Sequence, residues 1–285
     1  MKGVNKMNKT EIVELVLKEL KNRQERTKSE EVIHFSDKKE MGIANPQHIE
    51  VIQKAQKITP ARIGIGRAGT RMRTTSYLQF RIAHAAAQDA VLKDVDDDFI
   101  QSQDLPILTT KAEDMKSYLM DLDAGRTLSE ESLEWLKENG EKKKQVQLLV
   151  CDGLSSSAVT ANITDILPAL IQGLELKNIT VAKPLFVRRS RVWVQDQIAQ
   201  LVGCDLIVSL IGERPGLNTD ESLSAYIIYR PNEQTVEADR TVISNIHRGG
   251  LSPVEAGAHL SEVIEEMLRL KCTGVKFAQR ESGIK

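Results

Sequence analysis

The chain has 285 residues, enough for one large domain or two ordinary ones, and its composition excludes several classes of protein. Hydrophobic residues make up 41% of it, so it can bury a substantial core, while aromatic residues at 4% argue against a large all-β sandwich. The net charge of −1 gives no electrostatic reason to expect nucleic-acid binding, and no apolar run is long enough to span a bilayer. Three widely spaced cysteines form neither a metal-binding nor a disulfide pattern. We therefore expect a cytoplasmic protein that binds neither nucleic acid nor membrane.

Residues 1–44 are predicted to form a terminal amphipathic helix followed by a charged linker. Ile12, Val16 and Leu20 fall on one stripe of a helix over residues 8–20. Residues 21–39 are charged and nearly free of apolar clusters, which is typical of a mobile linker. Such a helix can dock on the protein's own core or in a groove of a partner, and the sequence does not choose between them.

Residues 45–140 are predicted to form a smaller, mostly helical domain. Three helices are expected, over Pro46–Gln56, Ser76–Leu92 and Lys111–Leu119. A fourth helix follows the capping-box pattern Thr127-Leu-Ser-Glu130 and ends at Gly140, a residue that commonly closes a helix.

This domain contains Gly64-Ile-Gly66-Arg-Ala-Gly69, which matches the G-x-G-x-x-G fingerprint of dinucleotide-binding proteins. The fingerprint requires a preceding strand, a following helix and an acid about 20 residues on that reaches the ribose. A polar helix and Pro60 precede these glycines, and Asp89 falls within a helical pattern, so the context disfavours a nucleotide site. The alternative is a glycine turn whose arginines pair with acids of this chain or a partner, or hold a phosphate; these are Arg67, Arg71 and Arg73.

Residues 141–285 alternate strand and helix patterns, which predicts an α/β domain with a Rossmann-like, mostly parallel sheet flanked by helices. Strands are expected over Gln145–Cys151, Thr180–Val187, Asp205–Leu210 and Ala225–Tyr229, and helices over Ala158–Leu174, Val192–Val202 and Pro253–Leu270. Three strands end in polar turns, at Asp152-Gly153, Arg188-Arg189-Ser190 and Glu213-Arg-Pro-Gly216. In parallel neighbours these turns meet at the carboxyl edge of the sheet, where such folds bind small molecules.

No catalytic residue and no metal site is identified in these turns. Asp152-Gly-Leu-Ser155 lacks the glycine that ends a G-x-S-x-G nucleophile elbow, and no histidine pair has metal-ligand spacing. His247 could serve as an acid or base, and a loop histidine bonded to the backbone is an equal alternative. The turns indicate binding machinery without its own chemistry, which is typical of one subunit of an enzyme.

Several motifs occur together in a single enzyme family: Gly66-Arg-Ala-Gly69, Asp152-Gly-Leu-Ser155, Gly212-Glu-Arg-Pro-Gly216-Leu217, Glu221-Ser-Leu-Ser224, Val236-Glu-Ala-Asp-Arg240-Thr241 and Ile243-Ser-Asn-Ile-His247. They run in unbroken order between about Asn45 and Lys276, and on them the chain resembles the small (light) subunit of ethanolamine ammonia-lyase. The resemblance implies a carbon–nitrogen lyase that uses adenosylcobalamin to convert ethanolamine into acetaldehyde and ammonia by a radical rearrangement. It also implies a hetero-oligomer, in which a TIM-barrel large subunit holds the ethanolamine and the small subunit covers the mouth of the barrel, with the cofactor between them. The N-terminal helix of such small subunits resembles peptides that direct cargo into a bacterial microcompartment, which implies that location and contact with its shell.

The resemblance carries three cofactor-binding positions onto this chain, Val192, Glu213 and Val242. Glu213 is expected to accept a hydrogen bond from a corrin side amide, while the two valines pack on the edge of the macrocycle. Position 242 is cysteine in some family members, so Val242 is expected to make an apolar or backbone contact. The segment Arg188-Arg-Ser-Arg-Val-Trp193 is more basic than the family pattern, which leaves its contacts open.

Two alternatives to these roles stay open at the level of sequence. Glu213 could merely pair with Arg214 or with an arginine near Gly66, and the chain could be an assembly subunit that never touches the cofactor. An independent nucleotide-binding enzyme that uses the Gly64–Gly69 turn is the third reading.

Overall fold

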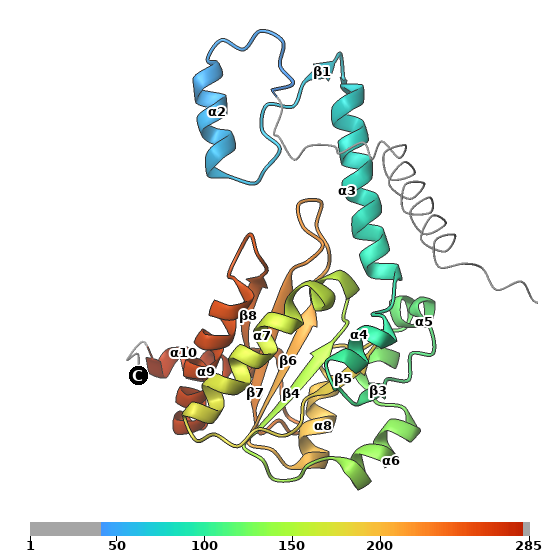
Figure 1. Ribbon diagram of the computed structural model, residues 1–285, viewed down its shortest axis with the longest axis vertical. Helices are drawn as coiled ribbons and strands as arrows, with labels where there is room; N and C mark the ends of the chain where they lie inside the picture. Colours follow the sequence, from blue (N-terminus) through green and yellow to red (C-terminus); the bar gives the residue numbers. More distant parts are fainter. Residues whose placement is uncertain (1–40, 282–285) are drawn as a thin grey trace, which may run out of the picture. The chain divides into compact units, whose positions relative to one another are not determined.

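Packing divides the chain into two compact units, Met1–Arg73 and Thr74–Lys285, of which the computed structural model describes residues 41–281. The helix expected over residues 8–20 and the linker over 21–39 lie outside the described residues. The predicted domains, with boundaries after residues 44 and 140, stay a prediction. Figure 1 labels the elements of both units.

The first unit contains helix α2 (Ile49–Ile58) and a short hairpin of strands β1 (Arg67–Ala68) and β2 (Arg71–Met72). Gly69 lies in the hairpin turn with φ +61°, a left-handed conformation that glycine adopts without strain. The glycine motif therefore leads into an antiparallel turn and lacks the strand–turn–helix context of a dinucleotide fingerprint.

The second unit is built on a six-stranded sheet of mixed direction (Figure 1). Its spatial order is β3 (Ile107–Thr109), β5 (Leu185–Arg188), β4 (Val146–Cys151), β6 (Leu206–Gly212), β7 (Leu223–Tyr229) and β8 (Thr241–Ile246). The first four are parallel to one another, while β7 and β8 are antiparallel additions at one edge. The α/β class is confirmed, and each of the four predicted strand regions contains a strand, although β5 begins at Leu185 and not at Thr180. Strands β3 and β8 were not predicted, the sheet is mixed, and its Rossmann-like character stays a prediction.

Helices pack on both faces of this sheet, which makes three layers (Figure 1). The helices of this unit are α3 (Thr74–Leu92), which buries only Ala90, α4 (Asp97–Ser102), α5 (Met115–Met120), α6 (Glu130–Asn139), α7 (Ser156–Leu176), α8 (Val194–Val202), α9 (Pro253–Leu270) and α10 (Gly274–Glu281). Leu148 and Val150 pack with α7 and α9 on one face, whereas Leu149 and Cys151 pack with α6 and α8 on the other. Burial on both faces explains why the central strands are almost continuously apolar.

Most helix boundaries follow the predicted capping signals. Ser155 caps α7, its hydroxyl accepting the Ala158 N–H at 3.1 Å, and α9 begins at Pro253 as predicted. The predicted cap of α6 is wrong: Ser129, not Thr127, accepts the Ser132 N–H, at 3.2 Å. Leu128 forms an antiparallel bridge with Thr110, in which the Thr127 carbonyl accepts the Lys111 N–H and Ser129 donates to the Thr109 carbonyl, so the helix begins only after Ser129.

Because β4, β5 and β6 are parallel neighbours, their three polar turns meet at one edge of the sheet, as predicted. In the part of the chain that the structure describes, no helix combines the length and apolar character needed to cross a membrane.

Candidate functional site

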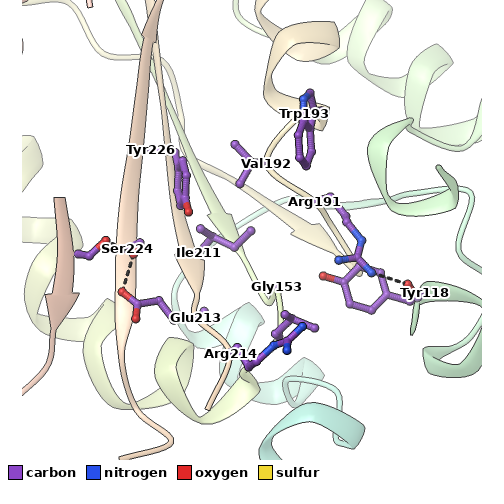
Figure 2. Close-up of a pocket in the computed structure, with 13 residues that line it drawn as sticks. Tyr118, Gly153, Arg191, Val192, Trp193, Ile211, Glu213, Arg214, Ser224 and Tyr226 are labelled. Atoms are coloured by element: carbon purple, nitrogen blue, oxygen red, sulfur yellow. Dashed lines mark hydrogen bonds between the residues drawn. The ribbon is translucent and has the colours of Figure 1, made fainter. Parts of the chain in front are cut away.

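A cavity of about 340 Å³ lies where the carboxyl ends of β4, β5 and β6 meet (Figure 2). Its lining consists of Tyr118, Gly153, Leu154, Arg191, Val192, Trp193, Ile211, Gly212, Glu213, Arg214, Ser224, Tyr226 and Ser244. The turn after β4 contributes Gly153, the segment after β5 contributes Val192, and the turn after β6 contributes Glu213. Two of the three predicted turns therefore line the site, while the third, Arg188-Arg189-Ser190, leads directly into the lining residues Arg191, Val192 and Trp193.

The structure brings together two of the three predicted cofactor-binding residues. Val192 and Glu213 both line the cavity. Val242 is not a lining residue; it lies on β8, opposite Tyr226 of the lining and two residues from Ser244, and is 42% exposed. Val242 therefore lies next to the lining of the cavity without forming part of it, and its role as a contact stays a prediction.

The carboxylate of Glu213 is held through only one of its oxygens. Oε1 accepts hydrogen bonds from the hydroxyl of Ser224 at 2.5 Å and from the N–H of Asn245 at 3.1 Å (Figure 2). Ser224 is buried, and its hydroxyl also lies 2.9 Å from that of Ser244. Among the described residues, Oε2 has no hydrogen-bond donor and Glu213 forms no ion pair with Arg214. Oε2 is therefore available to a ligand.

Two glycines allow the backbones beneath the cavity to approach closely. A Cβ on Gly212 would lie 2.2 Å from the carbonyl oxygen of Ser155, and one on Gly153 would lie 2.4 Å from that of Gly212. Gly153 also has φ +58°, a conformation that favours glycine. The floor of the cavity is thus main chain, which no side chain can replace without displacing β4 from β6.

Asp152 is buried and fastens the turn after β4 to the turn after β5. Its carboxylate accepts the N–H groups of Gly153 at 2.8 Å, Arg189 at 2.7 Å and Ser190 at 3.2 Å. Burial raises the pKa of Asp152 to about 6, against the opposing effect of these hydrogen bonds. The bonds fix the segment that carries Val192 relative to Gly153.

The basic segment after β5 is neutralised largely within the chain. Arg189 pairs with Asp94 at 2.6 Å, and Arg188 pairs with Asp97 and lies 3.9 Å from Asp94. Of the three arginines in this segment, Arg191 alone lines the cavity. Two of the three arginines that make this segment basic, Arg188 and Arg189, therefore form ion pairs within the chain.

Three aromatic side chains line the cavity, Tyr118 and Trp193 on one side and Tyr226 on the other (Figure 2). The Tyr118 hydroxyl donates to the Ser190 carbonyl at 3.0 Å, and burial raises the pKa of Tyr118, so the phenol stays protonated. The Arg191 guanidinium lies 4.5 Å from the centre of the Tyr118 ring and donates to its carbonyl at 2.8 Å. The Trp193 indole donates to Glu237 at 3.1 Å, so both aromatic rings are fixed in place.

Sequence reasoning missed Tyr118, Ser224 and Tyr226. Ser224 and Tyr226 alternate along β7 with the buried core residues Leu223 and Ala225, and this alternation could have marked them as a second, polar face. Tyr118 lies on α5, far away in sequence, and no local pattern connects it with the cavity.

The described residues provide recognition groups at this site and no assembled catalytic machinery. His247 is not a lining residue: its Nδ1 accepts the Gly249 N–H at 3.0 Å, and its Nε2 lies 2.8 Å from Asn245 Oδ1. The loop-bound alternative for His247 is thus the observed one. No group of three or more His, Cys, Asp or Glu within residues 41–281 could hold a metal ion.

Comparison with known proteins agrees with the resemblance seen in the sequence. The family model of the ethanolamine ammonia-lyase light chain (EutC) matches residues 49–278. The chain is 44% identical to a Clostridium perfringens protein named ethanolamine ammonia-lyase small subunit, over 92% of this chain and 90% of that protein. It is 44% identical to the protein of that name from Clostridioides difficile, over 86% and 84% of the two chains, and 48% identical to that from Clostridium tetani, over 82% and 79%. The family match includes the β1–β2 hairpin and every segment of the cavity, and the chain belongs to the ethanolamine ammonia-lyase light-chain family.

Proposed function

We propose that this chain is the small subunit of an adenosylcobalamin-dependent ethanolamine ammonia-lyase, a carbon–nitrogen lyase that yields acetaldehyde and ammonia. Family membership supports the reaction, and a large subunit that holds ethanolamine is the partner. The observation that carries the cofactor assignment is the cavity in which Glu213 presents an unpaired oxygen next to Val192.

The lining residues fit the edge of a corrin in their chemistry. Corrin side amides are hydrogen-bond donors, and Oε2 of Glu213 is an acceptor without a partner among the described residues. Val192, Ile211 and Tyr226 offer apolar surface beside it. Apolar walls with a few placed polar groups are typical of cofactor sites.

When bound, adenosylcobalamin supplies the radical by homolysis of its cobalt–carbon bond. The residues of this chain would bind and orient the cofactor. Ser224 and the Asn245 N–H fix Oε1 of Glu213, so Oε2 would accept a hydrogen bond from the cofactor with little further loss of side-chain entropy. Asp152 holds the segments that carry Gly153 and Val192 at a fixed separation. The radical rearrangement itself belongs to the large subunit.

Replacement of Glu213 by Gln in the two-subunit complex tests the cofactor assignment. We expect cobalamin affinity to fall about tenfold, because a charge-assisted hydrogen bond becomes a neutral one. Equilibrium dialysis of cobalamin measures this without relying on turnover. Glu262→Gln, an exposed substitution on α9, is the matched control. Unchanged affinity in the Glu213 variant would favour a pure assembly subunit.

The reaction is tested by co-expression with the large subunit. Cobalamin-dependent release of acetaldehyde from ethanolamine is the expected result, and its absence from a folded complex would refute the proposal. Titration of the chain with NAD or ATP tests the nucleotide alternative, for which we expect no binding.

We also propose that residues 1–40 direct the complex into a bacterial microcompartment, on the strength of the family resemblance alone. Deletion of residues 2–39 should release the complex from the shell. If shell association survives this deletion, the targeting role is wrong.

A further inference from the structure

Arg191 is a cation in the lining of the cavity that has no counter-charge within residues 41–281. Arg188 and Arg189, the other two arginines after β5, form ion pairs with acids of the chain. The carboxylate of Asp152 accepts three backbone N–H groups and forms no ion pair with Arg191. A charge that lies at a binding cavity and has no partner there indicates a charged ligand.

The guanidinium of Arg191 also has hydrogen-bond donors without acceptors. Its Nη2 donates to the Tyr118 carbonyl at 2.8 Å. Its Nε is buried and has no hydrogen-bond partner, and Nη1 donates to none of the residues that the structure describes. A buried N–H that has lost water and gained no acceptor is costly, and more so in a charged group. An oxyanion at this position would supply the missing acceptors.

The side chain of Arg191 is held in place before any ligand binds. Its guanidinium carbon lies 4.5 Å from the centre of the Tyr118 ring, and its backbone N–H donates to the carbonyl of Gly125 at 2.7 Å. A Cβ at Gly125 would lie 2.8 Å from Cγ of Arg191 and 2.9 Å from Cε2 of Tyr118, so the aliphatic stem packs against bare backbone there. A guanidinium fixed in this way loses little further conformational entropy when it binds a ligand.

Opposite charges lie on opposite sides of the cavity (Figure 2). Arg191 lies beside Tyr118 on one side, and Glu213 is bonded to Ser224 on the other. Arg214, an exposed cation that also lines the cavity, forms no ion pair among the described residues. The cavity therefore offers an acceptor for an amide on the β7 side and cationic donors for an anion on the α5 side.

We propose that Arg191 binds a phosphate-type oxyanion, and that this anion is the phosphodiester in the nucleotide tail of the cofactor. The choice of this source rests on the proposed function. The phosphodiester is the only anionic group among the peripheral substituents of cobalamin, and a guanidinium matches the geometry of phosphate oxygens. Glu213 would then hold an amide and Arg191 the phosphodiester, so that two separate contacts fix the orientation of the cofactor. Free inorganic phosphate is the other source of such an anion.

A series of three corrinoids isolates the contribution of the phosphate. Cobalamin and cobinamide phosphate carry it, whereas cobinamide lacks it. Equilibrium dialysis measures the affinity of the two-subunit complex for each of them, without relying on turnover. For Arg191→Gln we expect the Kd of cobalamin and of cobinamide phosphate to rise roughly tenfold, because a charge-assisted hydrogen bond is lost, and the Kd of cobinamide to stay unchanged.

Two further variants separate charge, geometry and packing. Arg191→Lys keeps the charge without the planar fork, so its affinity for the two phosphate-bearing corrinoids should fall between those of the parent and Arg191→Gln. Arg230→Gln is the matched control, because Arg230 also lies over a tyrosine ring, 5.5 Å from the centre of Tyr229, but is not a lining residue. This control should bind all three corrinoids like the parent.

Equal weakening of cobalamin and cobinamide by Arg191→Gln would show that Arg191 only supports the fold of the cavity, and would overturn the inference. Unchanged affinity for all three corrinoids would also overturn it, while the proposed function would stand. If the parent complex binds none of the three, both are wrong. A parent that does not distinguish cobinamide phosphate from cobinamide, but is stabilised against heat by inorganic phosphate only while Arg191 is present, would assign the site to free phosphate and not to the cofactor.

Discussion

At the cavity, one carboxylate oxygen of Glu213 accepts hydrogen bonds and the other has no donor among the described residues, and Ser224 is responsible for much of this arrangement. Replacement of Ser224 by Ala removes the 2.5 Å hydrogen bond and leaves only the Asn245 N–H on Oε1. We expect cobalamin affinity of the complex to fall several-fold, up to about tenfold, since the carboxylate gains freedom to turn away. Equilibrium dialysis measures the change.

Two further variants separate this positioning role from simple packing. Ser224→Thr keeps the hydroxyl and should restore affinity. In a Glu213→Gln background, Ser224→Ala should cost less than it does alone, because the interaction it supports is already weakened. Equal losses in both backgrounds would show that Ser224 acts independently of Glu213.

Asp152 predicts a pH dependence of stability at the same edge of the sheet. Burial raises its pKa from 3.8 to about 6, so the folded chain holds this proton more tightly than the unfolded chain. Its contribution to the free energy of unfolding is therefore fully present below pH 4 and is lost as pH rises through 6. Asp152→Asn does not titrate, so the difference in stability between parent and variant should decline by up to about 3 kcal/mol across this range. Urea unfolding at pH 4, 5, 6 and 7 measures it, and a difference that grows with pH would contradict the assignment.

At the scale of elements, a buried ion pair joins the start of β8 to the start of α8. Arg240 Nη2 lies 2.6 Å from Asp196 Oδ2, and the two side chains are 3% and 18% exposed. Burial raises the pKa of Asp196, and Arg240 opposes this rise. The pair connects the segments that carry Val242 and Val192.

Removal of one partner should be costly because it leaves the other charge without compensation. We expect Arg240→Met to lower the free energy of unfolding by about 3 kcal/mol, as is typical of a broken buried pair. The double variant Arg240→Met/Asp196→Leu should lose less, since no buried charge remains. Urea denaturation measures the free energy of unfolding of both variants. A larger loss in the double variant would show that an uncompensated buried charge does not explain the loss in Arg240→Met.

Elements that were predictable from the sequence are those whose burial leaves a strong local pattern. β4 and β6 are buried along their whole length and read as continuous apolar runs. β8 mixes exposed and half-buried residues, and β3 has only three residues, so neither produces such a run. The cap of α6 was misplaced because Thr127 and Ser129 are both good capping residues, and only the tertiary bridge between Leu128 and Thr110 keeps residues 127–128 out of the helix.

The residues of the candidate site also differ in how far the sequence could predict them. Glu213 and Val192 follow strands at the sheet edge, where topology alone places ligand-binding residues, and the family resemblance named both. Tyr118 reaches the cavity through a bond to Ser190, 72 residues further along the chain, which local sequence cannot reveal.

At the scale of the whole molecule, the cavity is too small to be a complete cofactor site. Its volume of about 340 Å³ is at the low end for a drug-sized ligand, and a corrin with its side chains and nucleotide is far larger. Val242, half-exposed beside it, lacks a covering surface in the described part of the chain. Under the proposed function, the remaining surface of the cofactor would be covered by another subunit.

This half-site predicts that cobalamin binds the isolated chain at least about tenfold more weakly than it binds the two-subunit complex, because apolar surface on one side of the corrin stays in water. Equilibrium dialysis of both preparations gives the comparison on one scale. Quenching of Trp193, which lines the cavity, reports occupancy in the isolated chain, and Trp193→Phe identifies its share of the signal beside that of Trp135. Glu213→Gln should weaken binding by a similar factor in both preparations, since Ser224 and Asn245 hold that carboxylate within this chain alone. Equal affinity of the isolated chain and the complex would contradict the half-site, because it would mean that the partner covers none of the cofactor.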